Sequence, residues 1–151
     1  MAGFRKIRQK FQDALEGDFE VRAIAGGFAV GVFFSFTPLF TLHMLLALLV
    51  AILFRFSKAA AMAGAWVNNP YTMPFVFYGC FRLGERILGI DIPPPNFEEI
   101  TATTLLQAAA PYAAPLLLGT TLVGILAAAV AYLVVYRVAI RIQSARRNAQ
   151  E

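Results

Sequence analysis

Charged residues are scarce and unevenly placed in this chain. They make up 15% of its 151 residues, against about a quarter in an ordinary soluble domain, while 59% are hydrophobic. Three runs contain no Asp, Glu, Lys or Arg, namely residues 23–54, 59–81 and 100–136. Each run exceeds the roughly 20 apolar residues that a helix needs to cross a bilayer. This pattern argues against a soluble domain and predicts an all-α, polytopic membrane protein with broken or re-entrant helices.

The chain also has few of the side chains that catalysis and metal binding require. Cys80 is its only cysteine and His43 its only histidine, so we expect neither an internal disulfide nor a metal site. It contains no Gly-rich phosphate loop and no nucleophile elbow, and its acids lie outside the three charge-free runs. We therefore expect no enzymatic activity and no cofactor. An intramembrane enzyme that uses His43 is the least favoured alternative, because this histidine has no visible catalytic companion.

The basic residues behind the net charge of +4 lie at both ends of the chain and at the edges of the runs, rather than on one soluble face. This placement argues against nucleic-acid binding and is typical of topology signals. Residues 1–22 predict an amphipathic surface helix, for which a short solvated helix is an equal alternative. Residues 137–151 form a basic tail. The positive-inside rule predicts that both termini of this multi-pass protein are cytoplasmic.

The membrane domain is expected over residues 23–136. Pro38 interrupts the first run, so residues 23–54 form either a kinked crossing or, as we prefer, a hairpin that returns to the cytoplasm. Residues 59–81 predict a proline-interrupted helix, residues 82–111 a loop with an interfacial segment, and residues 115–136 a transmembrane helix. An alternative arrangement makes the second run the re-entrant hairpin and the first run the crossing. Both arrangements leave the termini on the same side.

A polar and helix-breaking insert divides the second run, and it is the main candidate for a binding site. Backbone groups outside a helix have no water to bond at membrane depth, so they occur there only where they are buried in protein or line a polar cavity. Together with the break in the first run, the insert resembles the discontinuous helices that form substrate sites in transporters. The alternative is structural, in which its amides only satisfy carbonyls freed by the prolines. The candidate residues of the two breaks are Pro38, Asn68, Asn69, Pro70, Thr72 and Pro74.

Three further residues join the predicted substrate site. His43 is the only titratable nitrogen within a charge-free run, which indicates a proton relay or a ligand, or else a neutral ring bonded to a neighbouring helix. Arg82 follows the second run, shares a helix face with Glu85, and is a candidate for an anionic headgroup. Arg55 follows the first run. For Arg82 and Arg55 alike, the alternative to headgroup binding is ordinary snorkelling at a helix end.

Residues 27–89 resemble a family of bacterial membrane proteins known as domain of unknown function 2062. The most specific shared pattern is Asn68-Asn69-Pro70 followed by Thr72 and Pro74. Thr41 and Ser57 depart from it, where a glycine and an asparagine are usual. The resemblance implies a bacterial inner-membrane protein without an assigned activity. Some members are fused to glycosyltransferase domains, which implies a link to envelope or lipid-linked sugar metabolism. The other shared positions are Gly31, Pro38, His43, Arg55-Phe56-Ser57-Lys58, Trp66 and Leu83-Gly84.

Two functions are compatible with these sequence features. The first is a transporter or flippase for an anionic or lipid-linked envelope substrate, which uses a polar cavity between the broken helices. The second is a non-catalytic scaffold or partner subunit for an envelope-biogenesis enzyme, which needs packing without a cavity. The expected partners are membrane lipids, an anionic lipid-linked substrate, and either further copies of the chain or a partner membrane protein.

Overall fold

The computed structural model describes residues 20–39, 42–93 and 102–148, and every regular element among them is a helix. Residues 20–35 are helical and are followed by α2 (Leu42–Leu53), α3 (Lys58–Ala65), α4 (Met73–Leu88) and α5 (Ala102–Asn148). The all-α prediction is confirmed for these residues. Most of the amphipathic segment expected over residues 1–22 lies outside them.

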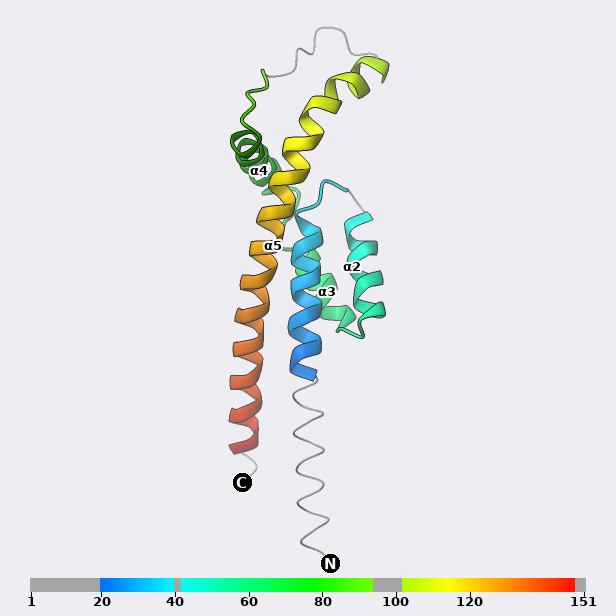
Figure 1. Ribbon diagram of the computed structural model, residues 1–151. Helices are drawn as coiled ribbons and strands as arrows, with labels where there is room; N and C mark the ends of the chain where they lie inside the picture. Colours follow the sequence, from blue (N-terminus) through cyan, green and yellow to red (C-terminus); the bar gives the residue numbers. More distant parts are fainter. Residues whose placement is uncertain (1–19, 40–41, 94–101, 149–151) are drawn as a thin grey trace, which may run out of the picture.

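The 20–35 helix lies at the centre of the arrangement (Figure 1). It runs from the lower end of the molecule towards the middle, and α2 runs back beside it. A turn at residues 54–57 connects α2 to α3, which packs against α2. The turn is held to the base of the 20–35 helix, because the Ser57 amide donates to the Ala23 carbonyl at 2.9 Å. The 20–35 helix and α2 therefore run antiparallel, with the end of α2 beside the start of the 20–35 helix.

Small residues allow the helix backbones to approach closely at two places. Gly31 of the 20–35 helix faces Gly64 of α3, and a Cβ added at Gly31 would lie 2.9 Å from the Gly64 Cα. Gly84 of α4 lies against the backbone of Pro115 in α5, and a Cβ there would collide with it. Such contacts are typical of helices that pack without a hydrophobic driving force between them.

The longest helix, α5, runs through both Pro111 and Pro115. The sequence predicts that an interfacial segment and a transmembrane helix are divided at these prolines. In the structure one helix runs through both of them. The helix instead bends in its upper, yellow part (Figure 1), as expected where a proline removes a backbone donor and crowds the preceding turn. It also continues past Arg137 into the basic tail. Helix α4 continues to Leu88, so the start of the loop expected over residues 82–111 is helical.

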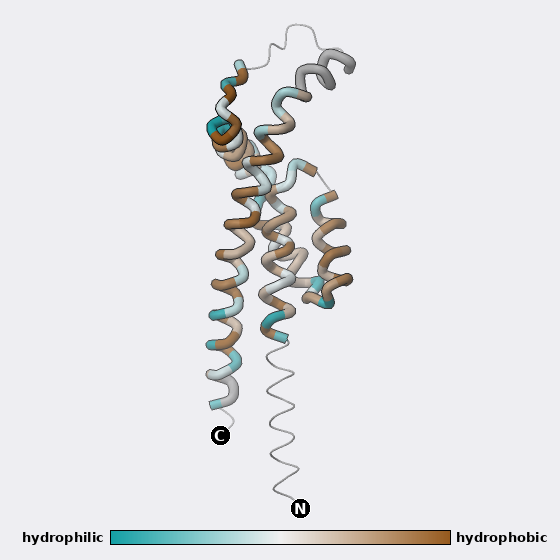
Figure 2. Tube along the Cα trace, viewed as in Figure 1, coloured by the Kyte–Doolittle hydropathy of each residue, from teal (hydrophilic) through white to brown (hydrophobic). Residues whose placement is uncertain are grey.

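Hydrophobic residues are frequent along the described helices (Figure 2), and many of their large side chains are exposed. Among the described residues, one helix is long and apolar enough to cross a membrane, over Ala110–Ala145 of α5, and only 17% of its most apolar part is buried in the structure. The exposed side chains on α2 and α4 include Leu53, Phe75 and Tyr78. The apolar groups of these helices therefore face outward as well as inward.

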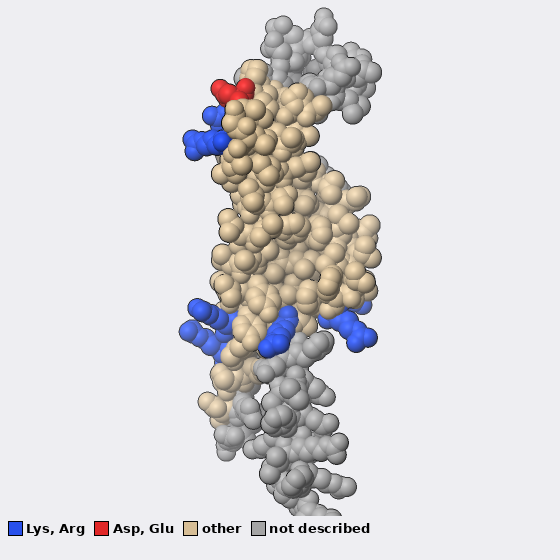
Figure 3. All heavy atoms as spheres, viewed as in Figure 1, with Lys and Arg blue, Asp and Glu red and all other residues tan. Residues whose placement is uncertain are grey.

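Lysine and arginine side chains gather at two levels, with a broad uncharged band between them (Figure 3). The lower level contains residues at the start of the 20–35 helix, in the α2–α3 turn and in the lower part of α5. The upper level lies at the end of α4, where acidic groups join it. The lower residues are Arg22, Arg55, Lys58, Arg137 and Arg141, and the upper ones are Arg82, Arg86, Glu85 and Asp91.

Candidate functional site

The first break follows Ser35, where the 20–35 helix ends. The Ser35 hydroxyl donates to the Val32 carbonyl at 2.7 Å, and the Thr37 hydroxyl donates to the Phe34 carbonyl at 2.6 Å. These bonds engage carbonyls in the last turn of the helix, and the Phe34 carbonyl also accepts from the Thr37 amide at 3.0 Å. Pro38 then prevents the helix from continuing in the same direction. Local sequence thus determines where this helix stops.

The second break lies between α3 and α4. Trp66 caps α3, and its amide donates to the Ala63 carbonyl at 3.3 Å. The Asn69 side-chain oxygen accepts from the amides of Tyr71 and Thr72, both at 3.0 Å. This turn at Asn69, together with a proline in the first turn of α4, starts the next helix. Asn69 therefore has a local structural role, which the sequence left open beside substrate binding.

Asn68 joins the two breaks. Its side chain is buried, and its Nδ2 donates to the Ser35 carbonyl at 3.0 Å, 33 positions earlier in the chain. Its Oδ1 accepts from the Thr72 hydroxyl at 3.1 Å. The structural alternative supposed that Asn68 bonds a carbonyl freed by Pro70 or Pro74. It instead bonds the Ser35 carbonyl, at the end of the helix that precedes the break in the first run. We call this arrangement of Ser35, Asn68 and Thr72 the junction.

His43 lies in the first turn of α2 and is buried, and its Nδ1 is 3.1 Å from the Leu39 carbonyl. Since α2 and α3 are joined by a short turn and run antiparallel, residues equally far from the turn lie at similar height. His43 is about 15 Å above the end of α2, and α3 ends about 11 Å above its own start, at 1.5 Å per residue. His43 is therefore close to the level of the junction.

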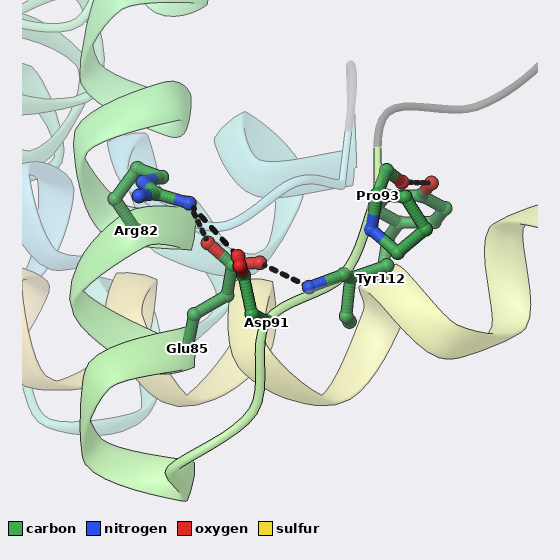
Figure 4. Close-up of polar contacts among 6 residues, drawn as sticks. Arg82, Glu85, Asp91, Pro93 and Tyr112 are labelled. Atoms are coloured by element: carbon green, nitrogen blue, oxygen red, sulfur yellow. Dashed lines mark hydrogen bonds and ion pairs between the residues drawn. The ribbon is translucent and has the colours of Figure 1, made fainter.

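The upper level of charge forms a compact cluster around a buried carboxylate (Figure 4). Glu85 Oε2 is 2.8 Å from Arg82 Nη1, and Glu85 Oε1 accepts from the Ile92 amide at 3.0 Å. Asp91 lies 3.5 Å from the same guanidinium nitrogen. The Tyr112 hydroxyl donates to the Pro93 carbonyl, which brings the segment after α4 against α5.

The Glu85 carboxylate raises the pKa of Arg82, by its charge and by its hydrogen bond. The guanidinium therefore carries its charge throughout the neutral pH range. Because Arg82 is already engaged by two acids, an anionic headgroup would compete with them for it. The sequence placed Glu85 on the same helix face as Arg82, three residues away, but it did not predict that the Glu85 carboxylate is buried.

Arg55 lies in the α2–α3 turn, which is far from the end of α4 that carries Arg82 (Figure 1). It is exposed and has a φ of 57°, which is uncommon for a residue other than glycine. Ser57, in the same turn, caps α3 by accepting from the Ala60 amide at 3.3 Å, as the asparagine usual there is able to do. Thr41, the second departure from the family pattern, lies outside the described residues. The structure brings Pro38, Asn68, Asn69, Pro70, Thr72 and Pro74 to one region, and it places Arg55 and Arg82 away from it.

Two apolar grooves run between the 20–35 helix and α5. One, of about 480 Å³, includes Phe36 and Val67, which flank the junction residues Ser35 and Asn68. The other, of about 470 Å³, includes Glu20 near its lower end, and Val134 lines both. The sequence did not predict these grooves, because they depend on how two distant helices pack.

The comparisons agree with the resemblance seen in the sequence. Residues 4–148 match a family described as an uncharacterized protein conserved in bacteria, DUF2062. No curated protein and no solved structure matches the chain. The match extends well beyond residues 27–89 and covers both breaks, the upper charge cluster and all of α5. The chain therefore belongs to the DUF2062 family of bacterial proteins.

Proposed function

We propose that this protein is a multi-pass, non-enzymatic transporter or flippase of the bacterial inner membrane, which moves an anionic or lipid-linked envelope substrate past the junction. The observation that carries the proposal is the hydrogen bond from Asn68 to the Ser35 carbonyl, which joins two interrupted helices at one buried point. In transporters, discontinuous helices that meet within the bilayer form the substrate site.

The two levels of charge support a bilayer between them. Tyr112 lies beside the upper cluster, and Arg137 lies 25 residues later in the lower level. At 1.5 Å per residue this part of α5 is about 37 Å long, close to the roughly 30 Å of a hydrocarbon core plus its interfaces. The excess of basic residues at the lower level favours the cytoplasm for that side.

Helix lengths support a re-entrant first run. The 20–35 helix is about 24 Å long and α2 about 18 Å, so neither reaches from the lower level to the far side of a roughly 30 Å core. By contrast, α3 starts at the lower level and α4 ends at the upper one, so together they connect the two levels (Figures 1 and 3). The hairpin then ends within the bilayer, beside the break in the crossing formed by α3 and α4.

The proposal is tested first by water access. In a Cys80→Ser background, single cysteines at Thr37 and Asn69 should react with a membrane-impermeant thiol reagent in intact vesicles, because a transport pathway must be hydrated at the junction. Single cysteines at Leu49 and Ile125, which are exposed on the apolar surface, are the matched controls and should not react.

Transport is then measured with the purified chain in liposomes, with radiolabelled phosphate and a fluorescent isoprenyl phosphate as probes. We expect movement of at least one probe above that in protein-free liposomes. Asn68→Ala should reduce it, whereas Thr121→Ala, which removes an exposed hydroxyl bonded to the Leu117 carbonyl of its own helix, should not. The transporter proposal fails if the junction cysteines are inaccessible and neither probe moves.

A scaffold is the second candidate, and one observation favours it. Among the described residues, no fully buried side-chain nitrogen or oxygen lacks a hydrogen-bond partner, so the junction is satisfied without a ligand. A scaffold predicts that crosslinking in membranes captures one partner protein in a fixed ratio. It also predicts that Asn68→Ala lowers recovery of that partner while the junction cysteines stay unreactive.

A further inference from the structure

The two apolar grooves between the 20–35 helix and α5 follow one another along these helices. We call the groove of about 470 Å³ the lower groove and the groove of about 480 Å³ the upper groove, and both include Val134. Ile24 lines the lower groove, and Phe28, about one turn further along the same helix, lines the upper one. Each volume is typical of a site for a small molecule.

The walls of the grooves favour a hydrocarbon chain as the occupant. All ten described residues that line the upper groove are apolar, and Glu20 and Gln143 are the polar ones among the nine that line the lower groove. Helices that pack closely in a bilayer need small residues at their contact, whereas valine and isoleucine form most of the lower groove. A flexible chain fills such a surface better than a second helix does.

The lower end of the track has polar groups of both signs. Glu20 and Gln143 line the groove there from opposite helices. Arg141 follows Val134 by seven positions, which is about two turns, so it lies on nearly the same face of α5 at the edge of the groove. A carboxylate accepts hydrogen bonds from an ammonium group, and a guanidinium binds a phosphate through two parallel bonds.

The depth of these groups agrees with that of a lipid headgroup. Gln143 lies six residues beyond Arg137 of the lower charge level, which is about 9 Å along the helix, and the headgroup region adds roughly 5–8 Å to each side of the core. Ala127 of the upper groove lies ten residues, or about 15 Å, in the other direction, which is half of a roughly 30 Å core. One acyl chain therefore reaches from the lower groove into the upper one.

We propose that the two grooves bind one phospholipid whose headgroup contains both a phosphate and a primary ammonium, as in phosphatidylethanolamine. Its acyl chain lies along the grooves, its ammonium donates to Glu20, and its phosphate binds Arg141. Phosphatidylglycerol has no cation for the carboxylate, and the quaternary ammonium of phosphatidylcholine has no N–H to donate. This site is separate from the junction and does not depend on transport there.

The first test compares the three phospholipids, with identical acyl chains, on the purified full chain by native mass spectrometry. We expect phosphatidylethanolamine to bind about tenfold more tightly than the other two, because its ammonium adds a hydrogen bond to a charged partner. Glu20→Gln should remove this preference. Asp91→Asn, which removes an exposed acid at the upper charge level, should keep it.

A second pair of variants tests the position of the chain. Ala131→Trp places a large side chain in the upper groove and should weaken binding of all three phospholipids. Ala129→Trp is the matched control, because Ala129 is exposed on the same helix and does not line either groove. It should leave binding unchanged.

Photolabelling of the unmodified protein in liposomes needs no variant to fold. Phosphatidylethanolamine with a diazirine in the middle of its acyl chain should label α5 around Val134 more strongly than the exposed Leu49 of α2. Excess unlabelled phosphatidylethanolamine should reduce the labelling near Val134, and the same excess of phosphatidylglycerol should reduce it much less.

Several results would overturn the proposal. Equal binding of the three phospholipids, or tighter binding of phosphatidylglycerol, would show that the ammonium is not recognised. Uniform photolabelling of the apolar surface would show that the grooves hold only bulk lipid, and crosslinking of Ala131 to a second copy would show a protein occupant. Liposomes that move neither transport probe would overturn the transport function and leave this lipid site intact.

Discussion

Glu85 shows how one buried carboxylate organises the upper end of the molecule. It is 2% exposed, and its two oxygens accept from Arg82 of its own helix and from the Ile92 amide beyond the end of α4. Gly89, with a φ of 65°, allows the chain to turn back at that point. The carboxylate therefore holds the segment after α4 against the helix that precedes it.

Replacing Glu85 with Gln should destabilise the protein. The amide keeps the size of the side chain but loses the negative charge, so the bonds that Glu85 accepts from the Ile92 amide and from the half-exposed Arg82 guanidinium become weaker. Hydrogen bonds to charged groups contribute about 1.5–3 kcal/mol, and we expect a loss in that range in the free energy of unfolding in detergent.

Asp91→Asn is the matched control for Glu85→Gln. Asp91 faces the same guanidinium, but its side chain is 93% exposed, so its removal should change stability much less. Equal effects of the two substitutions would show that burial of Glu85 has no energetic role.

Asn68 illustrates what the sequence reveals about a single residue. Its position in a break predicts that its amide serves either a ligand or a backbone carbonyl. The sequence does not reveal which carbonyl, because local rules connect a residue only to neighbours a few positions away. The Ser35 carbonyl is brought to Asn68 by the packing of two helices, and only the folded structure shows this pairing.

At the scale of elements, the contact between the 20–35 helix and α3 depends on the absence of side chains. A Cβ at Gly31 would lie 2.7 Å from the Ala65 amide nitrogen and 2.9 Å from the Gly64 Cα, and it would collide with the Ala61 carbonyl. All of these atoms belong to the backbone, which cannot move aside as a flexible side chain can. The two helices must therefore separate to accept any larger residue.

Gly31→Ala should lower the free energy of unfolding by about 1–3 kcal/mol, the usual cost of overpacking. Gly79→Ala is the control on α4, where an added Cβ meets nothing within 4 Å. It should be neutral or stabilising by about 0.5–1 kcal/mol, because alanine is the better helix former. Chemical unfolding of both variants in detergent measures the difference, and similar values would disprove the close contact.

The elements themselves follow from the sequence to different degrees. The charge-free runs and the prolines at positions 38, 70 and 74 predict helices with two breaks, and both breaks are present. The division expected at Pro111 and Pro115 is absent, because α5 bends there and Pro115 packs against Gly84. A proline lowers the stability of a helix, but whether the helix ends or only bends depends on its neighbours.

At the scale of the whole molecule, the two levels of charge predict a definite orientation in the membrane. In a Cys80→Ser background, a cysteine at Lys58 should react with an impermeant reagent only from the cytoplasmic side, and a cysteine at Asp91 only from the opposite side. Right-side-out and inside-out vesicles allow both measurements. Labelling of both positions from the same side would contradict the crossing formed by α3 and α4.

The overall arrangement was only partly predictable. Positive charges at the run edges favour the hairpin for residues 23–54, and in the structure Lys and Arg side chains gather at two levels (Figure 3). The apolar grooves between the 20–35 helix and α5 cannot be predicted from the composition or from the spacing of residues, because they depend on how the surfaces of two distant helices fit together. The level of His43 beside the junction likewise depends on the lengths of α2 and α3.

Trp66 gives the molecule an optical property of its own. It is the only tryptophan, it caps α3 two residues before Asn68, and it is 65% exposed. Its emission therefore comes from a single place beside the junction and responds to the polarity around it. A change in its wavelength on adding a substrate would reveal movement of this region in the unmodified protein, without any attached dye.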